Sequence, residues 1–268
     1  MNPYESGQLE QKIDLDFAHR RAEKVLNENA IRMGEFGDIY NVGDDIAYVE
    51  EKEKQFALNN TSAQIEQKKR ADILEAALLE EIELGNWLGE DTETIKTTKY
   101  DDIKNGIDAI VEFKEEERRA YHLGLALDVT FSIDVDKKLQ RIKEGIANGK
   151  LPSIKYFKSS HMGFRGELSE IPEVVIGIDQ QKTQEMTDAW INKDRKRLNG
   201  LPVKNIVLSE ILLQLDSFKK FAARNKQPGI ASRYGQVEKL VKSIVDEKNI
   251  SPEYDRVLMS IESSLRNI

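Results

Sequence analysis

The sequence contains no cysteine, which excludes disulfide bonds and thiolate metal sites. Its three histidines, His19, His122 and His161, are too widely spaced to form a zinc-binding pattern. No apolar run approaches the ~20 residues that a membrane-spanning helix needs. The first residues also lack the basic and then apolar segments of a signal peptide. We therefore expect a cytoplasmic protein that has no membrane partner.

Charged residues are abundant, and they are unevenly distributed along the chain. The net charge of −8 argues against a general coat for nucleic acid. Residues 181–268 nevertheless carry 16 basic and 11 acidic side chains, and nine basic but three acidic residues lie between Lys193 and Lys226. This basic stretch could hold a phosphate backbone, although charge alone favours a solvated helical surface.

Two segments of the chain alternate polar and apolar residues with a period of two, as half-buried strands do. The first spans residues 106–113 and the second spans residues 124–131. The alternation predicts one face made of Ile107, Ala109, Val111 and Phe113 in the first segment, and of Leu125, Leu127, Val129 and Phe131 in the second. On the opposite faces we expect Asp108 and Glu112 in the first strand, and His122, Asp128 and Thr130 in the second.

The other elements follow from helical periodicity and from turn residues. Residues 64–84, rich in Ala, Leu, Glu and Lys, predict a buried helix, and Trp87 and Trp190 are interpreted as core aromatics. We also expect short strands over 94–99, 154–157 and 174–178, a turn over 100–106, a polar loop over 158–170, and helices over 135–147, 187–198, 207–223, 235–247 and 252–265. Asp134 is the predicted N-cap of the helix over 135–147.

This order of elements predicts an α/β fold with a central mixed β-sheet, an α-βββ-α-β core flanked by helices. We expect a helical N-terminal extension over residues 1–60, the α/β core over 61–180 and a helical C-terminal region over 181–268. If the two alternating strands pair, the carboxylates of Asp108 and Asp128 lie side by side. Because two buried carboxylates repel each other, a divalent cation with oxygen ligands is the usual remedy.

The element order and these two acids resemble the PD-(D/E)XK, restriction-endonuclease-like superfamily of nucleases. Asp108 matches the first acid of the family's motif, and Asp128-Val129-Thr130 occupies the position of the acid-x-Lys triplet. The preceding helix offers Glu75 or Glu81 as the further acid, and the resemblance covers residues 62–180. It implies a Mg²⁺ or Mn²⁺ ion held by Asp108, Asp128, Glu75 and the Val129 carbonyl, and hydrolysis of phosphodiester bonds in DNA.

The departure from the family is Thr130, which stands where the motif has lysine. A neutral hydroxyl cannot stabilise negative charge as an ammonium group does. A displaced lysine could replace it, and the candidates are Lys138 with its neighbour Lys137, and Lys155. Alternatively, His122 acts as the general base or orients the attacking water molecule.

Three functions remain open at this point. The first is a nuclease with Asp108, Asp128, Thr130, Glu75 and Lys138 in its catalytic site. The second is a catalytically inactive module of the same fold that binds nucleic acid or a protein partner. The third is another metal-dependent phosphohydrolase, which the scarcity of histidine disfavours.

Overall fold

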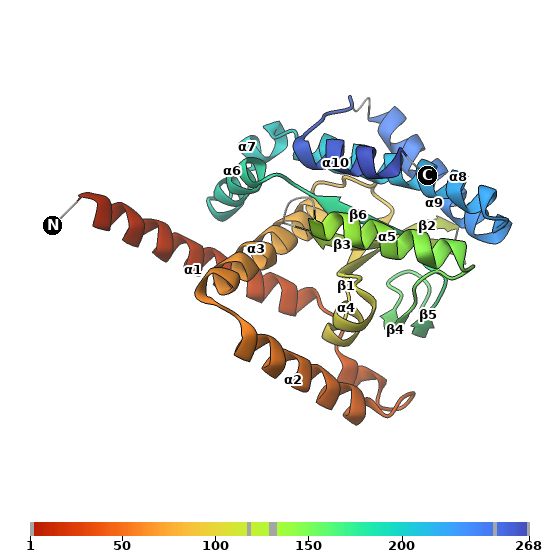
Figure 1. Ribbon diagram of the computed structural model, residues 1–268, viewed down its shortest axis with the longest axis horizontal. Coiled ribbons are helices and arrows are strands. Elements are labelled where there is room, and N and C mark those ends of the chain that lie inside the picture. The colour runs from red at the N-terminus through yellow and green to blue at the C-terminus, as the bar shows by residue number, and fades with distance from the viewer. Residues whose placement is uncertain (1–2, 117–118, 129–132, 249–250, 267–268) are drawn as a thin grey trace.

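A four-stranded mixed sheet lies at the centre of the computed structural model, which describes residues 3–116, 119–128, 133–248 and 251–266. Strands β1 (Thr92–Lys96), β2 (Ala109–Glu116) and β3 (Arg119–Asp128) form an antiparallel meander. Strand β6 (Glu173–Gly177) joins the sheet parallel to β3 after the crossover helix α5 (Ile133–Ala147). With the preceding helix α3 (Ser62–Leu84), these elements form the predicted α-βββ-α-β core and confirm the fold class (Figure 1).

Helix α3 forms where the sequence predicts it because both of its ends are capped. Thr61 accepts a hydrogen bond from the Gln64 N–H, and the Gln64 side chain accepts one from the Thr61 N–H. This capping box satisfies two backbone donors at the start of the helix. At its other end the Gly85 N–H donates to the Glu81 carbonyl. The apolar stripe of α3 is buried in the main core, together with Trp87 and Trp190, as expected for core aromatics.

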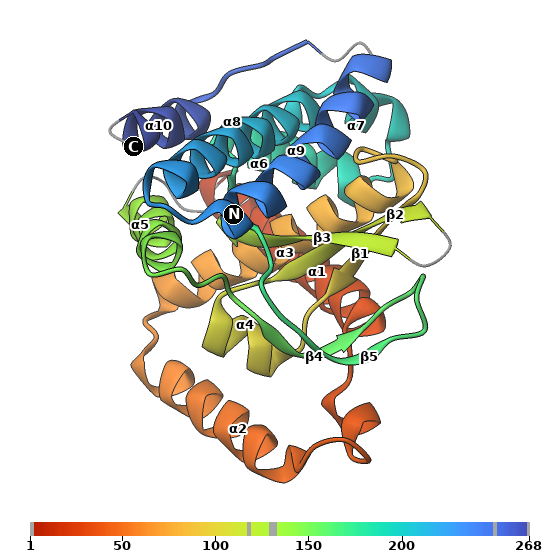
Figure 2. The ribbon, with the colours of Figure 1, turned by 90° about the vertical axis from the view of Figure 1, so that its right-hand side faces the viewer.

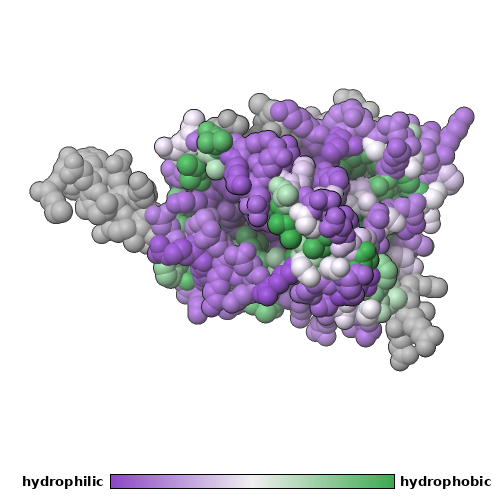
Figure 3. Space-filling view, turned by 90° about the horizontal axis from the view of Figure 1, so that it is seen from below, coloured by the Kyte–Doolittle hydropathy of each residue, from purple (hydrophilic) through white to green (hydrophobic). Residues whose placement is uncertain are grey.

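The N-terminal residues are helical, as predicted, and pack against the core. Helix α1 (Pro3–Asn29) buries Ala18 and Ala22 in the main core, and His19 Nε2 lies 3.0 Å from Asp72 Oδ2 of α3. A short 3₁₀ helix, η1 (Met33–Phe36), and helix α2 (Val42–Asn59) follow. The first part of α1 projects from the body of the molecule, and α2 lies below the sheet (Figures 1 and 2). Part of the surface seen from below is shown in Figure 3 and is mainly hydrophilic.

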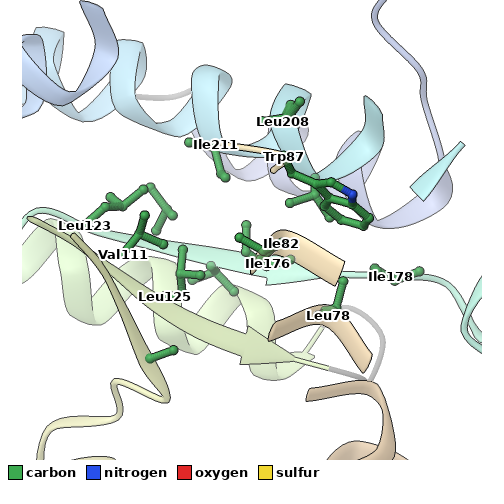
Figure 4. Close-up of a cluster of buried hydrophobic side chains, with 14 of the residues drawn as sticks. Leu78, Ile82, Trp87, Val111, Leu123, Leu125, Ile176, Ile178, Leu208 and Ile211 are labelled. Carbon is green, nitrogen blue, oxygen red and sulfur yellow. The ribbon is translucent and has the colours of Figure 1, made fainter. Parts of the chain in front are cut away.

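The C-terminal region contains helices that pack against the sheet, against α3 and against α5. They are α6 (Gln180–Ile191), α7 (Arg195–Gly200), α8 (Val203–Arg224), α9 (Pro228–Glu247) and α10 (Arg256–Leu265). Leu208 and Ile211 of α8 lie above Val111, Leu123 and Leu125 of the sheet (Figure 4). This packing explains why those strand residues are apolar. In the described part of the chain, no helix has both the length and the apolar character needed to cross a membrane.

Helix α8 also covers the free edge of β6 with two of its polar side chains. Gln214 accepts a hydrogen bond from the Val175 N–H at 2.8 Å and donates one to the Val175 carbonyl at 2.7 Å. One helical turn earlier, Glu210 accepts a hydrogen bond from the Gly177 N–H at 3.2 Å. These side chains therefore replace the backbone partners that an additional strand would provide.

Four sequence expectations are wrong in local detail. Residues 100–106 form helix α4 (Lys99–Asn105) rather than a turn, because Thr98 caps its first turn and Gly106 ends it in the left-handed region at φ 67°. The expected loop over 158–170 contains strand β5 (Arg165–Leu168), which pairs with β4 (Ile154–Lys158) in a separate sheet. The helix expected over 187–198 is divided into α6 and α7 by an N-cap at Asp194. Helix α5 already includes Asp134, so this residue is not its N-cap.

The alternation expected in the first strand begins later than the sequence pattern indicates. Ile107 does not share the core of Ala109 and Val111; it packs instead with Ile95 and Ile110. The reason is that regular pairing starts only at Ala109, after the turn that follows Gly106. As a result, Asp108 and Glu112 belong to two different polar clusters.

Candidate active site

A buried lysine lies among carboxylates at the edge of the sheet where β1 ends and β2 begins. Lys96 is the last residue of β1, and its Nζ lies 2.5 Å from Glu75 Oε1 of α3 and 3.6 Å from Asp102 Oδ2 of α4. Asp108, just before β2, is close enough for its charge to act on both Lys96 and Glu75. Only 7% of the Lys96 side chain is exposed, which is rare for lysine.

The charges in this cluster perturb one another strongly. Burial raises the pKa of Asp108 well above its usual value, and the charges of Asp102 and Glu75 raise it further, despite Lys96. Burial also raises the pKa of Glu75, although the Lys96 ammonium opposes this shift. For Lys96 burial acts to lower the pKa, but the surrounding carboxylates outweigh it and raise the pKa. The lysine therefore stays protonated, and the carboxyl groups compete for the single ammonium.

Local backbone interactions fix these side chains in place. The Asp108 N–H donates to the Leu125 carbonyl at 2.9 Å, and the Asp108 carbonyl accepts a hydrogen bond from the Thr97 N–H at 3.2 Å. Asp108 is thereby held between the backbones of β1 and β3. Asp102 is positioned by α4, whose first turn is capped by the Thr98 hydroxyl. Helix, strand and turn thus bring acids that are distant in sequence to one place.

The second predicted acid, Asp128, is the last residue of β3, and its backbone pairs with Gly177 of β6. The Asp108 N–H donates a hydrogen bond to the Leu125 carbonyl of β3, so both acids lie at the same end of the β2–β3 pair. The side chain of Asp128 lies outside the described part of the structure, as do Val129 and Thr130 entirely. Their roles as ligands and as the altered motif position stay predictions.

The structure separates the other candidates named from the sequence. Glu81 points away from the cluster and pairs with Arg195, whereas Glu75 faces Lys96. Lys155 is engaged elsewhere, because its Nζ lies 2.5 Å from Asp45 Oδ2. Lys138 lies close enough to Asp108 for its positive charge to lower the pKa of that carboxyl.

Glu112 and His122 form a second polar cluster with the loop that joins β4 to β5. Glu112 is fully buried, and it accepts hydrogen bonds from the Ser159 hydroxyl at 2.6 Å and the Ser160 N–H at 2.9 Å. His122 Nε2 lies 3.2 Å from the same carboxylate. Burial alone would raise the pKa of Glu112, but the hydrogen bonds from His122, Ser159 and Ser160 outweigh it and lower the pKa. His122 therefore serves to hold this loop, not the Asp108 cluster.

Three basic residues of the stretch between Lys193 and Lys226 form ion pairs with neighbouring acids. Lys219 pairs with Glu238 and with Asp216, and Lys220 pairs with Asp216 as well. Arg195 pairs with Glu81, as described above. A solvated, locally paired helical surface accounts for these charges.

The chemistry of the donor set suits a hard divalent cation, because Glu75, Asp102 and Asp108 offer carboxylate oxygens. Within the described residues, however, no three His, Cys, Asp or Glu side chains are close enough together to hold a metal ion. A complete site would need the Asp128 carboxylate and the Val129 carbonyl in addition to Asp108 and Glu75. Those four groups are the ones that the sequence resemblance assigns to the metal.

The sequence matches no protein-family model, and no curated protein and no solved structure matches it. The functional interpretation therefore depends on the residues of this chain. Lys96 and Asp102 are site residues that the sequence pattern does not single out. One available signal is that Lys96 lies within the strand predicted over 94–99, which precedes the Asp108 strand; a second is that Asp102 lies in the first turn after the Thr98 cap.

Proposed function

We propose that this protein is a divalent-metal-dependent, nuclease-like enzyme of the cytoplasm that hydrolyses phosphodiester bonds in DNA. The observation that best supports the proposal is the position of Lys96. Its buried ammonium lies beside Glu75 and within reach of Asp108, on an α-βββ-α-β core. A positive group is thus available near the candidate metal ligands, although Thr130 stands where the family's lysine is expected.

In this proposal each residue has a defined role. Asp108, Asp128, Glu75 and the Val129 carbonyl hold Mg²⁺ or Mn²⁺ through oxygen atoms. When bound, the ion lowers the pKa of a water molecule and stabilises the charge that develops on the phosphate. Because the pKa of Lys96 is raised, its ammonium stabilises negative charge and does not act as a general base. Lys138 adds a second positive charge near Asp108.

The proposal is tested by incubating the purified protein with supercoiled plasmid and with short single- and double-stranded DNA. We expect cleavage with Mg²⁺ or Mn²⁺, none with EDTA, and loss of cleavage in Asp108→Ala and Asp128→Ala. Asp246→Ala, which removes an exposed carboxylate from α9, serves as the control and keeps full activity. Cleavage that survives both site substitutions would refute the assignment.

Lys96→Gln tests the feature on which the proposal depends. Removal of a group that stabilises transition-state charge typically lowers the rate about 10²–10³-fold. We expect that loss at saturating metal concentration, with Mn²⁺ binding retained in a titration followed by electron paramagnetic resonance. Circular dichroism verifies the fold, since Lys96 is buried. Wild-type cleavage rates in a folded Lys96→Gln variant would remove Lys96 from the site.

A second candidate function is a catalytically inactive module of the same fold that binds nucleic acid or a protein partner. Two observations favour it: Thr130 replaces the motif lysine, and the described carboxylates near Asp108 already interact with Lys96. In that case a mobility shift with DNA occurs without cleavage in any metal. The same titration then detects no tight Mn²⁺ binding.

A further inference from the structure

Arg141 of α5 lies directly on the turn that leads to Asp108. Its Nη2 is 3.5 Å from the Gly106 carbonyl oxygen, two residues before Asp108 in the chain. A Cβ atom at Gly106 would lie 2.1 Å from Arg141 Nη1, so a residue with a side chain there would displace the guanidinium. Gly106 therefore both ends α4 and leaves room for Arg141.

A buried acid holds this arginine by one nitrogen only. Glu173, at the start of β6, has a side chain that is 2% exposed, and Arg141 Nη2 donates to its Oε1. The other guanidinium donors, Nη1 and Nε, have no acceptor among the described residues, and 44% of the Arg141 side chain is exposed. A guanidinium that is paired through one nitrogen and belongs to a partly exposed side chain is suited to binding a phosphate group.

The surroundings add positive charge to the same place. Lys138 precedes Arg141 by about one turn of α5, and its charge acts on both Asp108 and Glu173. Two basic side chains of α8, Lys219 and Lys220, are instead paired with acids. The cationic side chains Lys138 and Arg141, which lie near the turn at Asp108, both belong to α5.

We propose that Arg141 binds a phosphate group of the nucleic-acid strand next to the candidate active site, with Glu173 positioning its guanidinium. This inference rests on the proposed function, because it requires a strand to lie across the Asp108 cluster. It assigns the contact to α5 in place of the basic stretch from Lys193 to Lys226.

The test measures binding of labelled single- and double-stranded DNA by fluorescence anisotropy, with Ca²⁺ in place of Mg²⁺, over a series of salt concentrations. For Arg141→Gln we expect about tenfold weaker binding and a salt dependence reduced by about one phosphate contact. Arg141→Lys should recover the salt dependence, since lysine restores the positive charge but not the planar, two-nitrogen hydrogen-bonding geometry of the guanidinium. Arg224→Gln, which removes an exposed positive charge from α8, should bind as the wild type does.

A second variant separates binding from folding. Arg141→Gln leaves Glu173 buried without its partner, whereas Arg141→Gln combined with Glu173→Gln leaves no unpaired charge. The double variant should show the same loss of affinity. Wild-type affinity in both variants, or an equal loss in Arg224→Gln, would overturn the assignment while cleavage by the wild type still supports the proposed function. A wild-type protein that binds no DNA would overturn both.

Discussion

Glu210 of α8 offers a sharp test of how the edge of the sheet is stabilised. Its side chain is fully buried, it accepts one hydrogen bond from the Gly177 N–H, and its Oε1 has no hydrogen-bond partner. Burial raises the pKa of Glu210 well above its usual value, and the nearby charge of Asp255 raises it further. The carboxyl is therefore neutral at moderate pH and behaves like the amide of its neighbour Gln214.

The raised pKa makes the fold sensitive to pH in a defined direction. In the unfolded chain Glu210 ionises above pH ~4.3, whereas in the folded protein it keeps its proton to higher pH. Unfolding therefore releases a proton in this range, and the free energy of unfolding falls by about 1.4 kcal/mol for each pH unit. This loss continues with rising pH until the carboxyl of the folded protein ionises too. Glu210→Gln keeps the hydrogen bond from Gly177 and abolishes this slope.

The assay is thermal denaturation of wild type and Glu210→Gln from pH 4 to pH 7. The two should have similar stability near pH 4, and the variant should gain roughly 3–5 °C in Tm for each pH unit above about 5. Glu144→Gln, at an exposed glutamate of α5, provides the control and should give a curve parallel to wild type. A Glu210→Gln curve that also runs parallel to wild type would refute a buried, neutral carboxyl at this position.

Further predictions concern the β4–β5 loop, the turn at Gly106 and the N-terminal cap of α3. Glu112→Gln should destabilise the protein more near neutral pH than at low pH, because the lowered pKa of Glu112 contributes stability that is lost as the pH falls through the pKa of the folded protein. Denaturation at pH 7 and pH 3.5 measures the difference. Gly106→Ala should cost at least about 1–2 kcal/mol in urea denaturation, since its φ is 67° and a Cβ would meet Arg141. Thr61→Ala should cost about 1 kcal/mol and increase amide exchange in the first turn of α3, through loss of its capping box.

The arrangement of the core could be predicted because its signals are local and strong. The alternation in β2 and β3 and the apolar stripe of α3 reflect packing against the main core, which the structure shows for Val111, Leu123 and Leu125. Helix α4 could not be predicted in the same way. Seven residues are too few to show a helical period, and its existence depends on the Thr98 cap and the left-handed Gly106.

The sequence predicts only in part which acids lie together in the structure. That Asp108 belongs to a charged site follows from a polar residue in an apolar strand. That Glu75 rather than Glu81 faces it depends on how α3 is rotated against the sheet, which is decided by packing of residues distant in sequence. Likewise, Glu112 has the same strand parity as Asp108 in the sequence, yet its partners come from the β4–β5 loop, which no local pattern connects to it.

The position of Lys96 follows from the register between β1 and β2. In that register Ile95 is opposite Ile110 and Lys96 is opposite Ala109, and both isoleucines are buried in the same small core. A slip by one residue would send Ile95 to the other face of the sheet and remove Lys96 from Glu75. The apolar pair thus determines where the ammonium lies. Because the effect of a positive charge on a phosphate depends on distance and burial, not on the strand that carries it, a lysine from β1 is as suited to this role as one at position 130.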